Sequence, residues 1–261
     1  MRCDVCGKAL SGTYRTDLLF GDKACVPCAT TKQCQWCGRL RPSKKHFGYN
    51  SCDSCRSTAV DTPADLKRLR DATLPLIFEH FGPVSYGDLP IRFGIVPALE
   101  YGVLKPVGLA FYGSADDHIR LQEGMPFEYA VGILAHEYGH MLANLEPDSL
   151  LRRPRATMHD RVLEEGFCEV LCALGLLKSS SDAARFQSFL MPGNPDPVYG
   201  DGFRIMWSRL DEVGSAAALL ETLTLQEHHF KKPLSESKID DFEVPDDISP
   251  LVDMASGDRD K

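Results

Sequence analysis

Two histidines four residues apart, His136 and His140, with Glu137 between them, are the residues of this chain with the clearest chemistry. If the segment is helical, both imidazoles lie on one helix face and can reach a single zinc ion. The glutamate beside them can then take a proton from the water that attacks a substrate carbonyl. The pattern therefore indicates a zinc peptidase, with His136 and His140 as metal ligands and Glu137 as the catalytic base.

The residues around this motif have the spacing of an amphipathic helix. Apolar side chains recur at helical intervals from Phe127 to Leu145, and Pro147 follows as a stop. The two histidines fall on the opposite face, among glycine, alanine and asparagine rather than among charged residues. Such a face fits a cleft that other groups enter. The alternative is that both histidines are hydrogen-bonded residues of a buried helix that holds no metal.

A third metal ligand is expected further along the chain, because catalytic zinc takes three protein ligands and one solvent molecule. The segment from Val162 to Ala173 is apolar on nearly all sides and predicts a buried helix. Glu165 and Glu169 share one of its faces, where buried carboxylates need partners. We therefore expect Glu165 to bind the metal and Glu169 to accept a hydrogen bond from a ligand imidazole. The alternative places both glutamates on the surface.

The neighbouring Glu164 is the rival for the third ligand position. Glu165 is preferred because it directly precedes Gly166, and this pair resembles the Asn-Glu-Gly ligand segment of zinc aminopeptidases.

Two residues further downstream could act on a substrate. Tyr199 lies in a glycine-rich segment, where its hydroxyl could stabilise the oxyanion of a tetrahedral intermediate. The alternative is a tyrosine that only packs in a structural turn. Arg204 could bind a substrate carboxylate, or it could pair with acidic groups of the protein surface.

Eight of the ten cysteines form four Cys-x2-Cys pairs within the first 55 residues. In a reducing compartment such pairs indicate metal binding, and two pairs complete one closed tetrahedral zinc site. Sequential pairing into two structural zinc sites is expected, although interleaved pairing stays open. A glycine follows the first and the third pair, at Gly7 and Gly38, where a positive φ would turn backbone N–H groups toward sulfur. The eight cysteines are Cys3, Cys6, Cys25, Cys28, Cys34, Cys37, Cys52 and Cys55.

Charge is distributed unevenly along the chain. Residues 1–60 hold ten basic and four acidic residues, whereas the remaining 201 residues hold 19 basic and 33 acidic ones. Each four-thiolate zinc site adds about −2, which reduces the formal +6 of the first segment to roughly +2. The acidic remainder would repel a phosphate backbone, so nucleic acid is not an expected partner. A protein-binding or domain-positioning role is favoured for the cysteine-rich segment.

Length and composition suit a folded protein outside the membrane. The 261 residues are 43% hydrophobic, which is enough for a substantial core and leaves room for two domains. No apolar run approaches the roughly 18 residues that cross a bilayer, and the first residues lack the apolar core of a signal peptide. We expect a cytoplasmic protein with no membrane partner.

Local signals predict several further elements. Thr62 and Pro63 indicate a helix start, with the helix running toward His80 and kinked or divided at Pro75. Another helix is expected near 182–190. Strands are expected at 91–96, 108–112 and 118–122, the last of them either an edge strand that holds an extended substrate or a plain structural strand. The segment 234–261 has nine acidic and three basic residues and is expected to be a poorly ordered tail.

The order of these motifs resembles one family, the LIM-domain, ubiquitin-activated zinc metallopeptidases known as plant organ-size regulators. The resemblance spans most of the chain and is most specific in two runs, Glu-Glu-Gly-Phe-Cys at 164–168 and Tyr-Gly-Asp-Gly-Phe-Arg at 199–204. It implies a peptidase that cleaves regulators in the ubiquitin pathway, with ubiquitin or a ubiquitin-like protein as a partner. It also implies His136 and His140 as ligands, Glu137 as base and Glu165 as third ligand.

We therefore expect an α+β fold. A LIM-like double zinc-finger module at 1–60 would precede a mostly helical, gluzincin-like metallopeptidase domain with a small sheet at 61–233, and the tail at 234–261 would follow. The expected function is that of a zinc-dependent endopeptidase for protein or peptide substrates, with one catalytic and two structural Zn²⁺ ions. An aminopeptidase would need carboxylates for the substrate amine, such as a Gly-x-Met-Glu-Asn segment, which the sequence lacks. The non-enzyme alternative is a zinc-module adaptor with an inactive peptidase fold.

Overall fold

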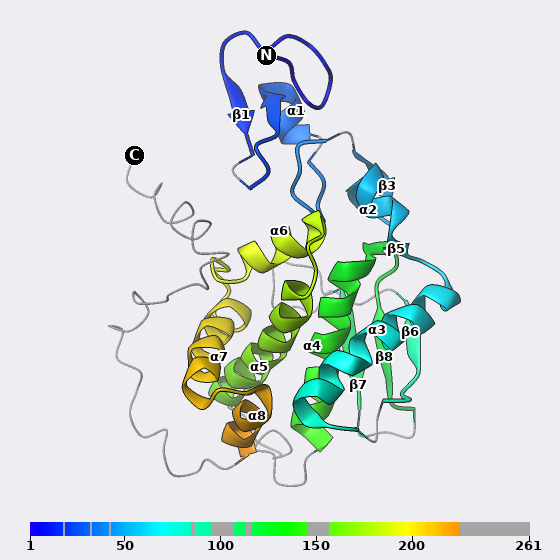
Figure 1. The fold of residues 1–261 in the computed structure, drawn as a ribbon, viewed down its shortest axis with the longest axis vertical. Helices are drawn as coiled ribbons and strands as arrows, with labels where there is room; N and C mark the ends of the chain where they lie inside the picture. Colours follow the sequence, from blue (N-terminus) through cyan, green and yellow to red (C-terminus); the bar gives the residue numbers. More distant parts are fainter. Residues whose placement is uncertain are drawn as a thin grey trace.

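The computed structural model describes residues 1–17, 19–31, 33–41, 43–84, 87–94, 107–112, 116–145 and 157–224. Two long helices, α4 (Phe127–Leu145) and α5 (Met158–Leu177), lie side by side at its centre (Figure 1). Around them pack α3 (Pro63–Phe81), α6 (Asp182–Leu190), α7 (Tyr199–Val213) and α8 (Ala216–Thr224). The chain is thus a mixture of helices and small sheets, as the sequence predicts.

A three-stranded sheet lies against α4. It consists of β6 (Ile91–Phe93), β7 (Gly108–Phe111) and β8 (His118–Leu121) in the order β6-β8-β7. Strand β8 is parallel to β6 and antiparallel to β7. All three fall within the predicted strand segments. Of the two alternatives for 118–122, the structure supports the plain structural strand and not the substrate-binding edge, because β8 is paired on both sides and β7 forms an edge of this sheet among the described strands.

Helix α3 starts where the sequence predicts. The Thr62 side chain accepts a hydrogen bond from the backbone N–H of Asp65, whose carboxylate accepts from the backbone of Thr62, and Pro63 occupies the first turn. Of the kink or division predicted at Pro75, the division is wrong, because the helix continues through this residue to Phe81. One missing N–H removes one backbone bond, and the packing of α3 against α4 keeps the helix continuous.

Helix α5 begins earlier than the apolar pattern alone indicates. Thr157 accepts a hydrogen bond from the backbone N–H of Asp160, and the Asp160 carboxylate accepts one in return from the backbone N–H of Thr157. The first turn therefore precedes the buried stretch that begins near Leu163. This early start places Arg161 on the helix, one turn before Glu165.

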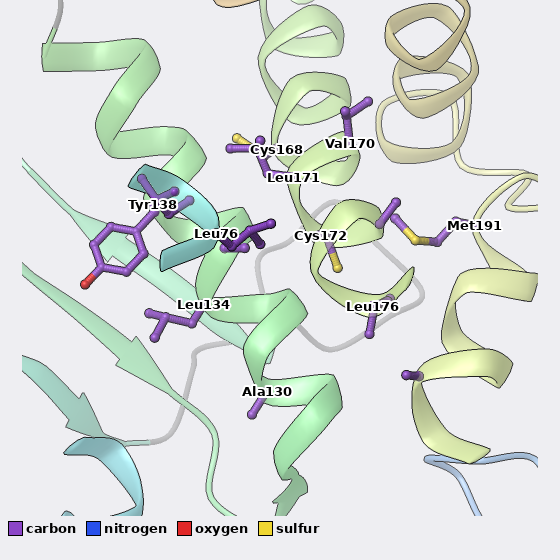
Figure 2. Packing of buried hydrophobic residues seen from close by; sticks show 14 of the residues in the cluster. Leu76, Ala130, Leu134, Tyr138, Cys168, Val170, Leu171, Cys172, Leu176 and Met191 are labelled. Atoms are coloured by element: carbon purple, nitrogen blue, oxygen red, sulfur yellow. The ribbon is translucent and has the colours of Figure 1, made fainter. Parts of the chain in front are cut away.

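The core lies mainly between α4 and α5. Figure 2 shows Leu134 and Tyr138 on α4 near Leu76 of α3, with Leu171 and Leu176 on the neighbouring α5. All five side chains are at most 4% exposed. Because both central helices are fixed by such packing, side chains on their facing surfaces have defined positions.

Helices α5 and α7 approach each other closely at two glycines. A Cβ on Gly166 would lie 2.2 Å from the carbonyl oxygen of Gly202, and a Cβ on Gly202 would lie 2.4 Å from that of Val162. Backbone atoms cannot move aside as side chains can, so only glycine fits at this crossing. The two sequence runs that carry the family resemblance therefore meet here, and Tyr199 is brought close to α5.

The cysteine-rich segment consists of two similar units, each an antiparallel hairpin followed by a short helix. In both units the first cysteine sulfur accepts a backbone N–H, from Cys25 to Cys3 and from Cys52 to Cys34, at 3.4 Å in each case. The glycines after the first and third pairs have φ of 72° and 67°, as predicted. The elements are β1 (Tyr14–Thr16), β2 (Lys23–Cys25), α1 (Val26–Thr31), β3 (Ser43–His46), β4 (Tyr49–Cys52) and α2 (Asp53–Ser57).

The second unit is joined to the helical part by a short β-pairing. Strand β5 (Ala59–Val60) pairs with β9 (Met125–Pro126), which leads directly into α4. The backbone N–H of Phe127, the first residue of α4, donates to the carbonyl of Thr58 at 2.9 Å. The start of the histidine-bearing helix is therefore fixed to the end of the second unit.

The predicted stop at Pro147 and the predicted acidic tail at 234–261 lie outside the described residues. Within the described ranges, none of the helices combines the length and the apolar character that a membrane-spanning segment requires.

Candidate metal centre and catalytic cleft

The two imidazoles of α4 face one carboxylate oxygen of α5. His136 and His140 are one turn apart, with ring centroids 5.0 Å from each other. Oε2 of Glu165 lies 3.5 Å from Nε2 of His136 and 3.5 Å from Nε2 of His140. The structure thus brings together the three residues that the sequence predicts as metal ligands.

The other nitrogen of each ring contacts a second carboxylate. Nδ1 of His136 lies 3.2 Å from Oε1 of Glu169, and Nδ1 of His140 lies 2.9 Å from Oε1 of Glu164. A protonated Nδ1 that donates to a carboxylate leaves the Nε2 lone pair directed at the Glu165 side. Glu169 is therefore where the sequence predicts it. Glu164, the rival third ligand, orients His140 instead.

Asn144 supports this arrangement from the end of α4. Its Nδ2 donates to Oε1 of Glu164 at 2.7 Å and to the backbone carbonyl of His140 at 2.9 Å. Glu164 is thus held by two donors and in turn holds His140.

The charges at this point are those of a cation site. Glu165 is 8% exposed, and its Oε2 has no hydrogen-bond partner within the described part of the chain. Burial lowers the pKa of His136, but the carboxylates of Glu165 and Glu169 outweigh it and raise the pKa well above its usual value. At His140 the carboxylates of Glu164 and Glu165 likewise outweigh burial and raise the pKa. A divalent cation can take the place of these protons, because it satisfies the same carboxylates.

Cys168 is a further potential ligand that sequence reasoning did not single out. Its Sγ lies within 4.8 Å of a ring nitrogen of both His136 and His140. Burial, followed by the charge of Glu164 and of other nearby carboxylates, raises the pKa of this thiol well above its usual value. Glu165 is already a carboxylate and faces both Nε2 atoms, so it is the better third ligand of the two.

Glu137 lies beside this centre in a closely fitted position. It is 4% exposed, and a Cβ on Gly108 of β7 would lie 2.4 Å from its Oε1. The backbone N–H of Ala110, on the same strand, donates to this carboxylate. Burial raises the pKa of Glu137, and its Oε2 has no hydrogen-bond partner among the described residues. A carboxylate in this state is suited to accept and return a proton.

A cleft of about 510 Å³ opens at the candidate metal centre. One side is formed by the edge strand β7 and the residue after it, the other by the C-terminal part of α4 and the first turns of α5. The residues that line it are Leu109, Ala110, Tyr112, His140, Asn144, Thr157, Met158, Arg161, Glu164 and Glu165.

Two phenols lie near the centre. Tyr112 lines the cleft, and burial together with the charge of Glu164 raises its pKa. Tyr199 begins α7 rather than lying in a loop, because the Asp196 carboxylate accepts its backbone N–H at 3.0 Å. Burial and the charge of Glu165 raise the pKa of Tyr199, whose hydroxyl is bonded to the Arg161 side chain. Both phenols therefore remain protonated near neutral pH.

Arg204 is engaged in holding a loop. Its guanidinium donates to the carbonyl oxygens of Pro192 at 2.8 Å and Asn194 at 3.0 Å, and it pairs with Asp201. It is not among the residues that line the cleft. Of the two alternatives, the structure favours pairing within the protein over binding of a substrate carboxylate.

The N-terminal cysteines form two groups in the sequential pairing. Cys3, Cys6, Cys25 and Cys28 make the first cysteine cluster, and Cys34, Cys37, Cys52 and Cys55 make the second cysteine cluster. Within each cluster all the sulfur atoms lie within 4.8 Å of one another, so each could hold a metal ion. The expected sequential pairing is confirmed, and the interleaved one is excluded.

Several residues of the site were missed by sequence reasoning. Gly108, Tyr112 and Arg161 reach the centre only through the packing of β7 and α5 against α4. Only Arg161 carried a usable signal, since it lies four residues before Glu165 and so on the same helix face.

Comparison with known proteins adds nothing to this picture, because no family model, curated protein or solved structure matches the chain.

Proposed function

We propose that this protein is a zinc-dependent endopeptidase that hydrolyses protein substrates. One observation carries the proposal: Oε2 of Glu165 faces Nε2 of both His136 and His140 at 3.5 Å, while a carboxylate contacts the Nδ1 atom of each ring. That combination is the donor set of a catalytic zinc site with its supporting hydrogen bonds. Three protein ligands leave room for solvent and substrate.

The residues present fit a zinc ion. The partnerless Oε2 of Glu165 and the two Nε2 lone pairs supply one carboxylate and two imidazole ligands. A zinc ion bound there supplies Lewis-acid polarisation of the scissile carbonyl and makes the attacking water more acidic.

Glu137 moves the proton. Its carboxylate takes a proton from the attacking water and then passes it to the nitrogen of the leaving amine. The Ala110 N–H and the close contact with Gly108 hold the carboxylate in place during both transfers. The raised pKa makes Glu137 a stronger base, which favours the first transfer, and the leaving amine is basic enough to take the proton in the second. The hydroxyls of Tyr112 and Tyr199 are the neutral donors available for the developing oxyanion.

The edge strand β7 provides a means of holding a substrate backbone. Leu109 and Ala110 line the cleft, and the Ala110 N–H points away from β8 toward Glu137. An extended peptide that adds to this edge would run past the catalytic glutamate with its side chains alternating toward and away from the protein. This mode suits an internal segment of a protein chain and favours an endopeptidase.

The remaining parts of the proposal rest on the resemblance and on the cysteine clusters. The two clusters are assigned as structural zinc sites of a LIM-like module, and the helical part as a gluzincin-like peptidase. A link to ubiquitin or a ubiquitin-like protein, and a cytoplasmic location, stay predictions. The adaptor alternative is disfavoured because the donor set and Glu137 are complete and lie beside a cleft.

The decisive experiment separates metal binding from catalysis. Purified full-length protein, Glu137→Gln and His140→Ala are analysed for zinc per chain and for cleavage of a mixed peptide library. We expect three zincs in the parent and in Glu137→Gln, and two in His140→Ala. Cleavage by Glu137→Gln should fall by about 10² to 10⁴-fold, the usual contribution of a general base.

The matched control is Glu128→Gln, which makes the same chemical change in the first turn of the same helix. It should keep three zincs and the parental rate. Two zincs in the parent, or cleavage by Glu137→Gln at the parental rate, would refute the proposal.

A further inference from the structure

Arg161 stands out in the cleft because of its charge. It lies on α5, one turn before Glu165, and lines the cleft with its side chain partly buried. Among the described residues that line this cleft it is the only lysine or arginine. The acidic groups of the same centre are the carboxylates of Glu137, Glu164, Glu165 and Glu169.

Arg161 differs from other arginines of the described ranges in its partners. Within the described ranges no aspartate or glutamate is ion-paired with Arg161, in contrast to Arg39, Arg92 and Arg204. Its hydrogen-bond partner there is the hydroxyl of Tyr199, a neutral group. The charge of the Glu165 carboxylate also acts on the guanidinium, but Glu165 is the proposed zinc ligand. With that carboxylate engaged by zinc, an anionic ligand would complete the hydrogen bonding of Arg161.

The position of Arg161 determines which part of a substrate it can reach. Residues four apart on a helix face have Cβ atoms about 5–6 Å apart, so the guanidinium lies close to the proposed metal ligand Glu165. An extended peptide advances about 3.3 Å per residue. A group held by Arg161 therefore belongs to a residue within about two positions of the scissile bond.

We propose that Arg161 is a specificity residue that binds a carboxylate of the peptide substrate, close to the bond that is cut. The inference rests on the proposed peptidase function and adds a substrate class to it. A guanidinium offers a planar pair of N–H donors that matches a carboxylate, and a good charge-assisted pair of this kind exceeds a neutral hydrogen bond in strength. The carboxylate can come from an aspartate or glutamate side chain or from the free C-terminus of a peptide.

A preference for substrates with a carboxylate is the opposite of what the overall charge of the protein predicts. The chain carries a formal −8, and four glutamates lie at the proposed metal site, so charge alone would favour basic substrates. A preference for acidic peptides would therefore be an effect of Arg161 and not of the electrostatic potential of the whole protein.

The test uses matched peptides and the zinc-loaded full chain. Cleavage sites are first mapped in a mixed peptide library by mass spectrometry. A cleaved peptide is then remade with glutamate or glutamine at each position within two residues of the cut, and with a free or amidated C-terminus. The measured quantity is the ratio of kcat/KM between the charged and the neutral member of each pair, which separates the two sources of carboxylate.

We expect a ratio of at least about 10 in the parent at one of these positions, which corresponds to 1.4 kcal/mol. The ratio should fall to near 1 in Arg161→Gln and stay above 1 in Arg161→Lys, which keeps the charge but loses the planar donor pair. Lys67→Gln is the control for net charge, since Lys67 is an exposed residue of α3. It should keep the parental ratio.

A binding measurement gives a readout that does not require turnover. The affinity of the charged and neutral peptides for zinc-loaded Glu137→Gln, with and without Arg161→Gln, is measured by fluorescence anisotropy. The charged peptide should bind more tightly only when Arg161 is present. Two results would overturn the inference while leaving the peptidase proposal intact. One is a ratio of kcat/KM near 1 at all positions in the parent. The other is an equal loss of affinity for the charged and the neutral peptide in Arg161→Gln. Failure of the peptidase proposal is seen separately, in the zinc count and in the effect of Glu137→Gln alone.

Discussion

At the scale of single residues, the site is defined by contacts that restrict movement. Each imidazole is held at one nitrogen by a carboxylate and faces Glu165 with the other. Glu137 is fixed from the opposite side by strand β7, through the N–H of Ala110 and the absent side chain of Gly108. A proton-transfer group has to be placed accurately, so this close fit should matter for catalysis.

Gly108→Ala tests that restriction. The added Cβ would lie 2.4 Å from Oε1 of Glu137 and 2.8 Å from Cγ2 of Ile133, so the carboxylate has to move by about 1 Å. We expect kcat/KM for peptide cleavage to fall about 100-fold, the scale expected for such a misplacement, while zinc content stays at the parental level. Gly193→Ala is the control, since its Cβ would meet nothing closer than 3.9 Å. Parental activity in Gly108→Ala would mean that Glu137 is not the base in this position.

The proposed ligands and the orienting Glu169 were predictable from the sequence because their geometry is local. His136 and His140 are four apart on one helix, and so are Glu165 and Glu169 on another. Other features of the site depend on how separate elements pack. They are the side of the sheet that faces the site and the presence of Arg161 in the cleft. Local periodicity carries no information about that packing.

At the scale of elements, α5 connects the site to the rest of the helical part. It carries the proposed third ligand and both orienting glutamates, and it crosses α7 at the contact between Gly166 and Gly202. The sequence predicted the α6 segment and the start of α3 well, because caps and periodicity are local. It placed Tyr199 in a loop, because the glycine-rich pattern gives no sign of the hydrogen bond from the Tyr199 N–H to the Asp196 carboxylate at the start of α7.

Gly202→Ala should destabilise the protein through this crossing. Alanine favours a helix over glycine by about 1 kcal/mol, but the new Cβ would lie 2.4 Å from the Val162 carbonyl oxygen, so the helices must separate. Overpacking costs typically about 1–3 kcal/mol, and contact with backbone belongs at the upper end. We expect a net loss in the free energy of unfolding, measured by denaturant titration at saturating zinc. Ser208→Ala, on the exposed side of α7, should change it by less than about 0.5 kcal/mol.

At the scale of the whole molecule, the two cysteine units differ in how they join the helical part. The second cysteine cluster belongs to the main hydrophobic core, together with Trp36, whose ring lies 5.6 Å from that of Tyr129 on α4. The first cysteine cluster has a small core of its own. It is connected to the rest through Arg39, which lies 3.2 Å from Asp22 and also pairs with Asp182 of α6. It also contacts α6 through Phe20, whose ring centroid lies 5.6 Å from the guanidinium of Arg185. The main core therefore extends across the domain boundary that the sequence suggests at residue 60.

This difference predicts unequal effects of losing one cysteine ligand from each cluster. Cys6 is exposed, whereas Cys37 is 1% exposed and lies in the unit that fixes the start of α4 through Thr58. Structural zinc contributes several kcal/mol to the fold it closes, so Cys37→Ser should lower the main thermal transition by about 10 °C or more. Cys6→Ser should lose one zinc but shift that transition by less than about 3 °C, because its core is separate. Zinc content and thermal unfolding followed by circular dichroism measure both effects. Equal shifts of the thermal transition in the two variants would show that both units unfold together with the helical part. An unshifted transition in Cys37→Ser would show that the second cysteine cluster does not support α4.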